Sequence, residues 1–240
     1  MDKINKMVFG ACVTTCILTL VTFIMAFMTP PLSGPFCAST SCYTYPYLDI
    51  ANRFPRDYWW MFIAILQLIV LVIFITVLHL SAPSDKKTWS LAGLIFAVVS
   101  VAILLSDYFV QVSVVQPSVL KGETGGIALL SQYNPHGIFI ALEELGYLLM
   151  SLGLGLMAPV LGADRLSKIV KWIFVSCLVL TVLSFAAIIA AYGINREYRF
   201  EIASITFNWI ALILGSGLLS VVYYRSRKEG RIEILHDATP

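Results

Sequence analysis

The run Trp59–Leu80, WWMFIAILQLIVLVIFITVLHL, is the stretch of sequence that decides the fold. It contains no Asp, Glu, Lys or Arg. A bilayer core about 30 Å thick needs roughly 20 consecutive apolar residues in a helix that crosses it. The run therefore predicts a transmembrane helix.

Five further apolar stretches of similar length accompany this one along the chain. The six predicted spans are residues 7–28, 59–80, 89–112, 137–161, 169–194 and 201–224. A large all-helical soluble core would instead show polar stripes at helical spacing, which most of these stretches lack. We therefore predict an all-α, polytopic membrane protein, with a single transmembrane domain over residues 1–224 and a charged tail over residues 225–240.

The first stretch also resembles a secretory signal, because Lys3 and Lys6 precede it. A signal has an apolar core of roughly 7–15 residues, and this stretch is longer. We expect it to be retained as a span.

The composition excludes several classes of protein. Apolar residues make up 59% of the chain and charged residues 12%, against roughly 25% charged residues in an average soluble domain. The mean hydropathy is +0.85. A net charge of +2 is too balanced for a polybasic surface that binds nucleic acid. The expected partner is the lipid bilayer, and no oligomeric state is indicated.

Lys and Arg residues in the predicted loops are distributed unequally between the two sides. One side has eleven of them: Lys3, Lys6, Lys86, Lys87, Arg165, Lys168, Lys171, Arg225, Arg227, Lys228 and Arg231. The other side has five: Arg53, Arg56, Lys121, Arg196 and Arg199. Because cytoplasmic loops carry the excess of Lys and Arg, we predict a cell-membrane protein with both termini in the cytoplasm.

Two external loops follow from this orientation, residues 29–58 and 113–136. The first contains Cys37 and Cys42, and on the oxidising side of the membrane this pair favours a disulfide. The second is apolar in its middle, at residues 127–131, and we expect a short interfacial or re-entrant segment there.

Polar side chains inside the predicted spans cluster at one depth. The amide and carboxyl groups in this layer are Gln67, Asp107, Gln111, Glu143, Glu144 and Asn208. At 1.5 Å per residue they lie about 7–14 Å below the external surface. His136 and Tyr147 extend the set, because they lie seven residues before and four residues after Glu143 on nearly one line of a helix.

The three carboxyl groups of this layer, on Asp107, Glu143 and Glu144, carry the functional hypothesis. Charges inside spans are expensive and usually mark a function. No Lys or Arg lies inside a span at this depth, so only arginines of the external loops (Arg53, Arg56, Arg196 and Arg199) could pair with them. Otherwise we expect at least one carboxyl group to be protonated at neutral pH, because burial and neighbouring like charges disfavour ionisation.

The leading prediction is a polar pocket that opens to the external side and binds or transports a small solute or cation, with proton coupling as an option. For the amides alone, interhelical hydrogen bonding is the simpler interpretation. One alternative function is an intramembrane enzyme that uses His136 and the carboxylates, with a metal or as acid and base. Another is an accessory protein that docks a partner on its external loops.

Catalytic signatures do not decide between these alternatives. The patterns H-E-x-x-H, G-x-S-x-G and G-x-x-x-x-G-K are absent. The layer contains one His, whereas a zinc site usually has more nitrogen or sulfur ligands. We therefore assign no metal ligands, and neither a cofactor nor an enzymatic activity is indicated.

Overall fold

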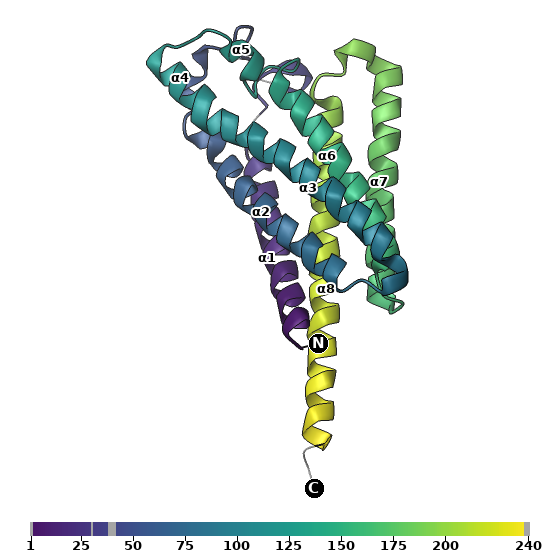
Figure 1. Ribbon diagram of the computed structural model, residues 1–240. Coiled ribbons are helices and arrows are strands. Elements are labelled where there is room, and N and C mark those ends of the chain that lie inside the picture. The colour runs from purple at the N-terminus through teal and green to yellow at the C-terminus, as the bar shows by residue number, and fades with distance from the viewer. Residues whose placement is uncertain (1, 30, 38–41, 238–240) are drawn as a thin grey trace.

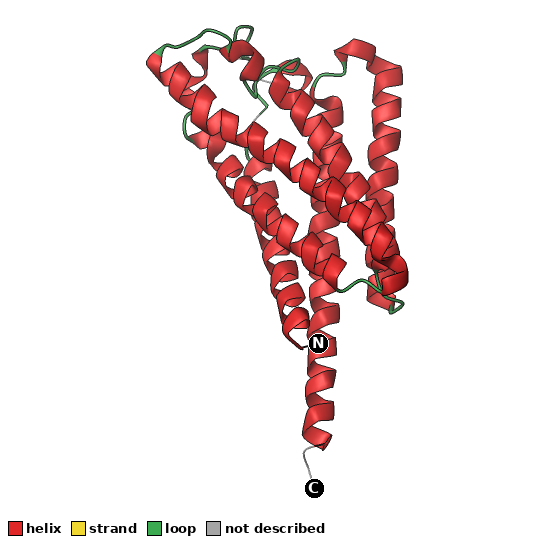
Figure 2. Ribbon diagram, in the orientation of Figure 1, coloured by secondary structure: helices red, strands yellow, loops and turns green. Residues whose placement is uncertain are grey.

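The computed structural model describes the backbone of residues 2–29, 31–37 and 42–237. In these ranges the regular elements are helices, and no strand occurs (Figure 2). The six long helices are α1 (Asp2–Phe27), α2 (Trp59–Leu80), α3 (Lys87–Val110), α6 (Ile138–Met157), α7 (Arg165–Tyr192) and α8 (Tyr198–Asp237). Each contains a stretch long and apolar enough to cross a membrane, in agreement with the six predicted spans. The chain is that of a multi-pass membrane protein.

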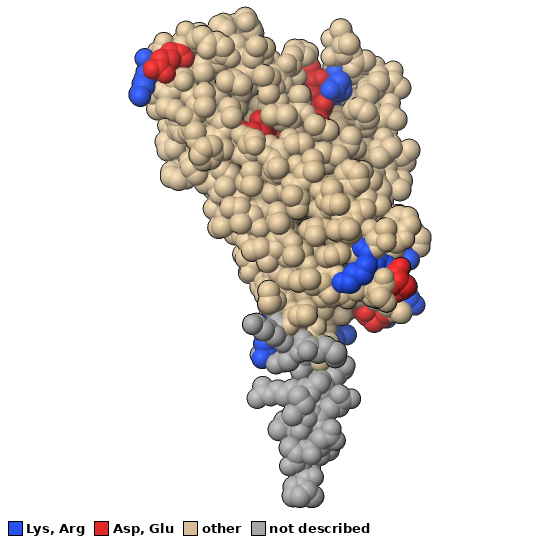
Figure 3. Space-filling view, in the orientation of Figure 1, with Lys and Arg blue, Asp and Glu red and all other residues tan. Residues whose placement is uncertain are grey.

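The helices pack as an irregular bundle (Figure 1). The main packing pairs are α3 with α6 and α2, α1 with α2 and α8, and α7 with α6 and α8. Both ends of the chain lie at the same end of the bundle, which we call the terminal end. The opposite end, the loop end, carries residues 28–29, 31–37, 42–58, 122–137 and 193–197. Figure 3 shows a side on which charged residues gather near the two ends and a broad uncharged belt separates them.

The third span is longer than predicted. α3 continues through a π-helical turn, η5 (Gln111–Val115), into α4 (Gln116–Lys121). Pro117, which falls within the predicted second loop, lies instead inside this continuous helix, in the first turn of α4 directly after the π-helical turn. The helix ends at Gly122, whose φ of 75° suits glycine. The predicted boundary at residue 112 is therefore wrong, and the loop begins at residue 122.

Two other features lie at predicted places, and the first loop adds three short turns. The apolar middle of the second loop forms the short helix α5 (Ile127–Leu130), with Ile127 buried. Cys37 and Cys42 form the predicted disulfide. The first loop is compact, with the 3-10 turns η1 (Gly34–Phe36), η2 (Asp49–Arg53) and η3 (Arg56–Tyr58).

The close contact between α3 and α6 depends on glycine. A Cβ placed on Gly93 would lie 2.9 Å from the carbonyl oxygen of Gly153, and one placed on Gly153 would lie 3.1 Å from that of Gly93. Small residues let two helix backbones approach each other inside a membrane. This contact sets the spacing of the two helices that carry Tyr108 and Glu143.

Candidate functional site

Glu143 on α6 lies at the centre of a buried hydrogen-bond chain. Its Oε1 accepts a hydrogen bond from the hydroxyl of Tyr108 on α3 at 2.7 Å. The hydroxyls of Tyr108 and Tyr147 lie 2.8 Å apart, and the indole N–H of Trp209 on α8 donates to Tyr147 at 3.1 Å. All four side chains are at most 2% exposed. Three helices thus meet in one polar chain inside the bundle.

The order of donors in this chain follows from chemistry. An indole N–H only donates, so the Tyr147 oxygen accepts from Trp209. The single hydroxyl proton of Tyr108 is donated to Glu143. In the hydrogen bond between the two tyrosine hydroxyls, Tyr147 must therefore be the donor and Tyr108 the acceptor. Every proton of the chain therefore points toward Glu143, which indicates that its Oε1 acts as an acceptor.

Glu201, in the first turn of α8, is the partner of Glu143 that the sequence analysis missed. Its carboxyl group lies within hydrogen-bonding range of the Glu143 carboxyl group. Two carboxyl groups can bond only when one of them carries a proton. Tyr108 donates to Glu143 Oε1, so the proton that the two carboxyl groups share lies between Glu143 Oε2 and the Glu201 carboxyl group. The sequence signal that could have found Glu201 is its spacing. It lies seven residues before Asn208 on one helix, so the two side chains lie on nearly one line of that helix.

Asn208 joins the same region through the backbone. Its side-chain amide donates to the carbonyl oxygens of Tyr147 at 3.0 Å and Ser204 at 2.8 Å. Asp107 is buried and close enough to Glu143 for their charges to interact. Its Oδ2 has no hydrogen-bond partner among the described residues. The structure thus brings four predicted residues together: Asp107, Glu143, Tyr147 and Asn208.

Glu144 faces a different direction and has its own partner. Arg196, between α7 and α8, reaches its carboxylate with two nitrogens at distances of 2.6 to 3.2 Å. This bidentate pair raises the pKa of Arg196. Of the loop arginines considered as partners, Arg196 is the one that pairs with Glu144, and the pair ties the α7–α8 turn to α6.

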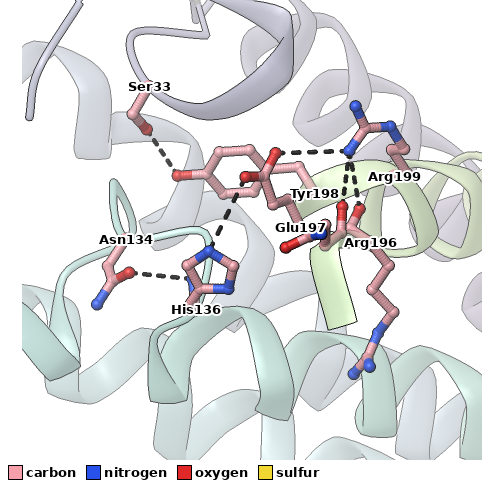
Figure 4. A network of polar contacts seen from close by, with 8 residues as sticks. Ser33, Asn134, His136, Arg196, Glu197, Tyr198 and Arg199 are labelled. Atoms are coloured by element: carbon pink, nitrogen blue, oxygen red, sulfur yellow. Dashed lines mark hydrogen bonds and ion pairs between the residues drawn. The ribbon is translucent and has the colours of Figure 1, made fainter. Parts of the chain in front are cut away.

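His136 does not share a helical line with Glu143, because α6 begins only at Ile138. Figure 4 shows its ring turned toward Glu197, and the ion-pair distance is 3.9 Å. The backbone N–H of His136 donates to Asn134 Oδ1 at 3.0 Å. His136 and Glu197 line a cavity of about 210 Å³ with Glu144 and Arg196, outside the Glu143 chain.

The two remaining predicted residues, Gln67 and Gln111, lie apart from the buried hydrogen-bond chain around Glu143. Gln111 anchors the second loop, because its amide nitrogen donates to the carbonyl of Leu130 and its amide oxygen accepts from the N–H of Gln132 at 3.2 Å. Gln67 is buried on α2, and its Nε2 finds no partner among the described residues. The role of Gln111 is thus structural.

A cavity of about 430 Å³ lies beside Glu201 at the loop end. Seven of the described residues that line it are aromatic: Phe23, Phe27, Phe36, Trp60, Tyr133, Tyr198 and Trp209. Glu201 is the one charged side chain among the described residues that line it. The cavity has the size of a site for a small organic molecule. It meets the buried chain twice, at Glu201 and at Trp209.

A comparison of the chain with protein-family models, with curated proteins and with solved structures found no match. Among the described residues, no group of three or more His, Cys, Asp or Glu side chains is arranged to hold a metal ion.

Proposed function

We propose that this membrane protein binds a small organic cation at Glu201 and releases the proton that Glu201 shares with Glu143. One observation carries the proposal: the Glu201 carboxyl group lines an aromatic cavity and also contacts a second buried carboxyl group. A cation at Glu201 would replace the proton as the partner of the negative charge. Aromatic faces such as Trp60 and Trp209 favour an organic ammonium through cation–π attraction.

The surroundings of Glu201 support a cation rather than an anion. The charged or titratable side chains that interact with it are Glu143, Glu144 and Tyr147 from α6, Asp107 from α3, and Tyr198 from its own helix. The nearby Arg196 forms its ion pair with Glu144 and not with Glu201. The acidic groups outnumber the basic ones, so the site favours a positive ligand.

The test is calorimetric binding of benzyltrimethylammonium to the purified full chain in buffers of different ionisation enthalpy. We expect release of up to one proton per bound cation. Because protons and cations compete for one site, the affinity should fall as the pH falls, approaching tenfold per pH unit while the pair is protonated.

The informative variant is Glu201→Gln, with Glu123→Gln as the matched control on an exposed residue of the loop end. We expect Glu201→Gln to lose binding and proton release, and Glu123→Gln to keep both. Equal binding by the wild type and Glu201→Gln, or binding without proton release, would overturn the proposal. Cation-driven proton flux in proteoliposomes tests whether the same site transports its ligand.

We further propose that the loop end faces the outside of a cell membrane and that both termini are cytoplasmic. The excess of Lys and Arg at the terminal end supports this orientation. Single cysteines at positions 86 and 121 should react with an impermeant reagent from opposite sides of intact cells, the second from outside. Labelling of both from one side would contradict it.

A further inference from the structure

The cavity beside Glu201 is roofed at the loop end by hydrogen bonds. The hydroxyl of Tyr198 donates to the carbonyl oxygen of Gln132 at 3.2 Å and lies 2.7 Å from the hydroxyl of Ser33. These bonds join α8 to both loops. Tyr133 completes the roof, since its hydroxyl donates to the buried carboxylate of Asp57 at 3.0 Å.

Residues on the side of the cavity are exposed. Phe27, in the last turn of α1, is 85% exposed, and Ile202, in the first turns of α8, is 42% exposed, while Phe36 of the first loop is 41% exposed. Phe27 and Ile202 line the cavity and belong to segments able to cross a membrane. In a membrane their exposed surfaces would face lipid, and we call the surface between Phe27 and Ile202 the side mouth.

The side mouth exists because α1 and α8 pack together only between it and the terminal end of the bundle. The rings of Phe9 and Tyr224 lie 6.1 Å apart, Cys16 donates to the carbonyl of Ile213 at 3.4 Å, and the rings of Phe23 and Trp209 lie 5.8 Å apart. Beyond the Phe23–Trp209 contact the cavity separates the two helices. An acyl chain can thus lie along α1 and α8 in lipid while its headgroup enters.

We propose that the ligand is an amphiphile with an ammonium headgroup, which enters through the side mouth from the surrounding lipid. This inference rests on the proposed function, because the ammonium group takes the place of the cation at Glu201. Ile202 and Ile205 line the path from the mouth to the carboxyl group. A cavity of about 430 Å³ accommodates the headgroup and part of a single chain.

The test uses the full chain in phosphatidylglycerol vesicles, whose lipids carry no ammonium group. Bound radiolabelled benzyltrimethylammonium is measured while octadecyltrimethylammonium, which stays in the membrane, is added. We expect displacement by this membrane-confined probe and none by octadecanol, which has the chain without the charge.

The matched variants are Ile202→Trp at the side mouth and Ile210→Trp, which changes an isoleucine 41% exposed on the same helix but outside the cavity lining. Ile202→Trp should raise the octadecyltrimethylammonium concentration needed for displacement at least tenfold, whereas Ile210→Trp should leave it unchanged. If benzyltrimethylammonium binds but octadecyltrimethylammonium does not displace it, lateral entry is wrong and the cation site stands. If benzyltrimethylammonium does not bind, the proposed function itself fails.

Discussion

The hydroxyl of Tyr108 donates a hydrogen bond to Glu143 Oε1 at 2.7 Å and so joins α3 to α6 inside the bundle. Through Tyr147 and Trp209 the same chain reaches α8. This contact makes Glu143 Oε1 an acceptor, so the proton shared with Glu201 lies between Glu143 Oε2 and the Glu201 carboxyl group.

Tyr108→Phe should destabilise the protein by about 1–3 kcal/mol, because it leaves the buried Glu143 oxygen and the Tyr147 hydroxyl without their partner. The measurement is reversible unfolding in detergent. Tyr45→Phe is the control, since Tyr45 is 72% exposed and should change the free energy of unfolding by less than about 0.5 kcal/mol. Equal free energies of unfolding for the two variants would show that the hydrogen bond from Tyr108 does not stabilise the protein.

The Glu144–Arg196 pair should show coupling in a double-mutant cycle. Glu144→Gln and Arg196→Gln each leave one member unpaired, and the double variant should be less destabilised than the sum of the two. We expect a coupling energy of about 0.5–3 kcal/mol, toward the lower end because Arg196 is partly exposed. A coupling energy near zero would mean that the pair does not hold the α7–α8 turn.

Asp164 caps α7 and should make its stability depend on pH. Its carboxylate accepts from the backbone N–H groups of Leu166 at 3.1 Å and Ser167 at 3.0 Å. The hydrogen bond from Ser167 lowers the pKa of Asp164 in the folded protein. The stabilisation is therefore present above the pKa of the unfolded chain and is lost as the pH falls through the lower, folded value.

Asp164→Ala should accordingly cost about 1 kcal/mol at neutral pH and less in acid, as measured by unfolding at several pH values. Asp164→Asn keeps an acceptor oxygen and should restore most of the stability without the pH dependence. A cost for Asp164→Ala that stays constant down to pH 2 would contradict the cap.

Gly153→Ala should destabilise the α3–α6 contact by about 1–3 kcal/mol, because the added methyl group would lie 3.1 Å from the backbone of Gly93. Gly125→Ala is the matched control, since a Cβ there meets nothing within 4 Å. Thermal unfolding of the two variants distinguishes them. A Gly153→Ala protein as stable as Gly125→Ala would mean that the helices separate at little cost.

The sequence by itself was enough for the six spans and the Cys37–Cys42 disulfide, because each depends on local properties. A membrane requires about 20 apolar residues per helix wherever the helix lies in the bundle. The end of the third span was the exception: Pro117 indicates a loop in isolation, and only the π-turn before it shows that the helix continues.

The partners of the carboxyl groups were decided only by the tertiary structure. Depth along a span is readable from the sequence, and it correctly singled out Asp107, Glu143 and Glu144 as buried. Which neighbour each one faces depends on the rotation and spacing of separate helices. Glu144 therefore pairs with Arg196, and Glu143 with Tyr108 and Glu201, although the local helical pattern shows only that the two adjacent glutamates face different directions.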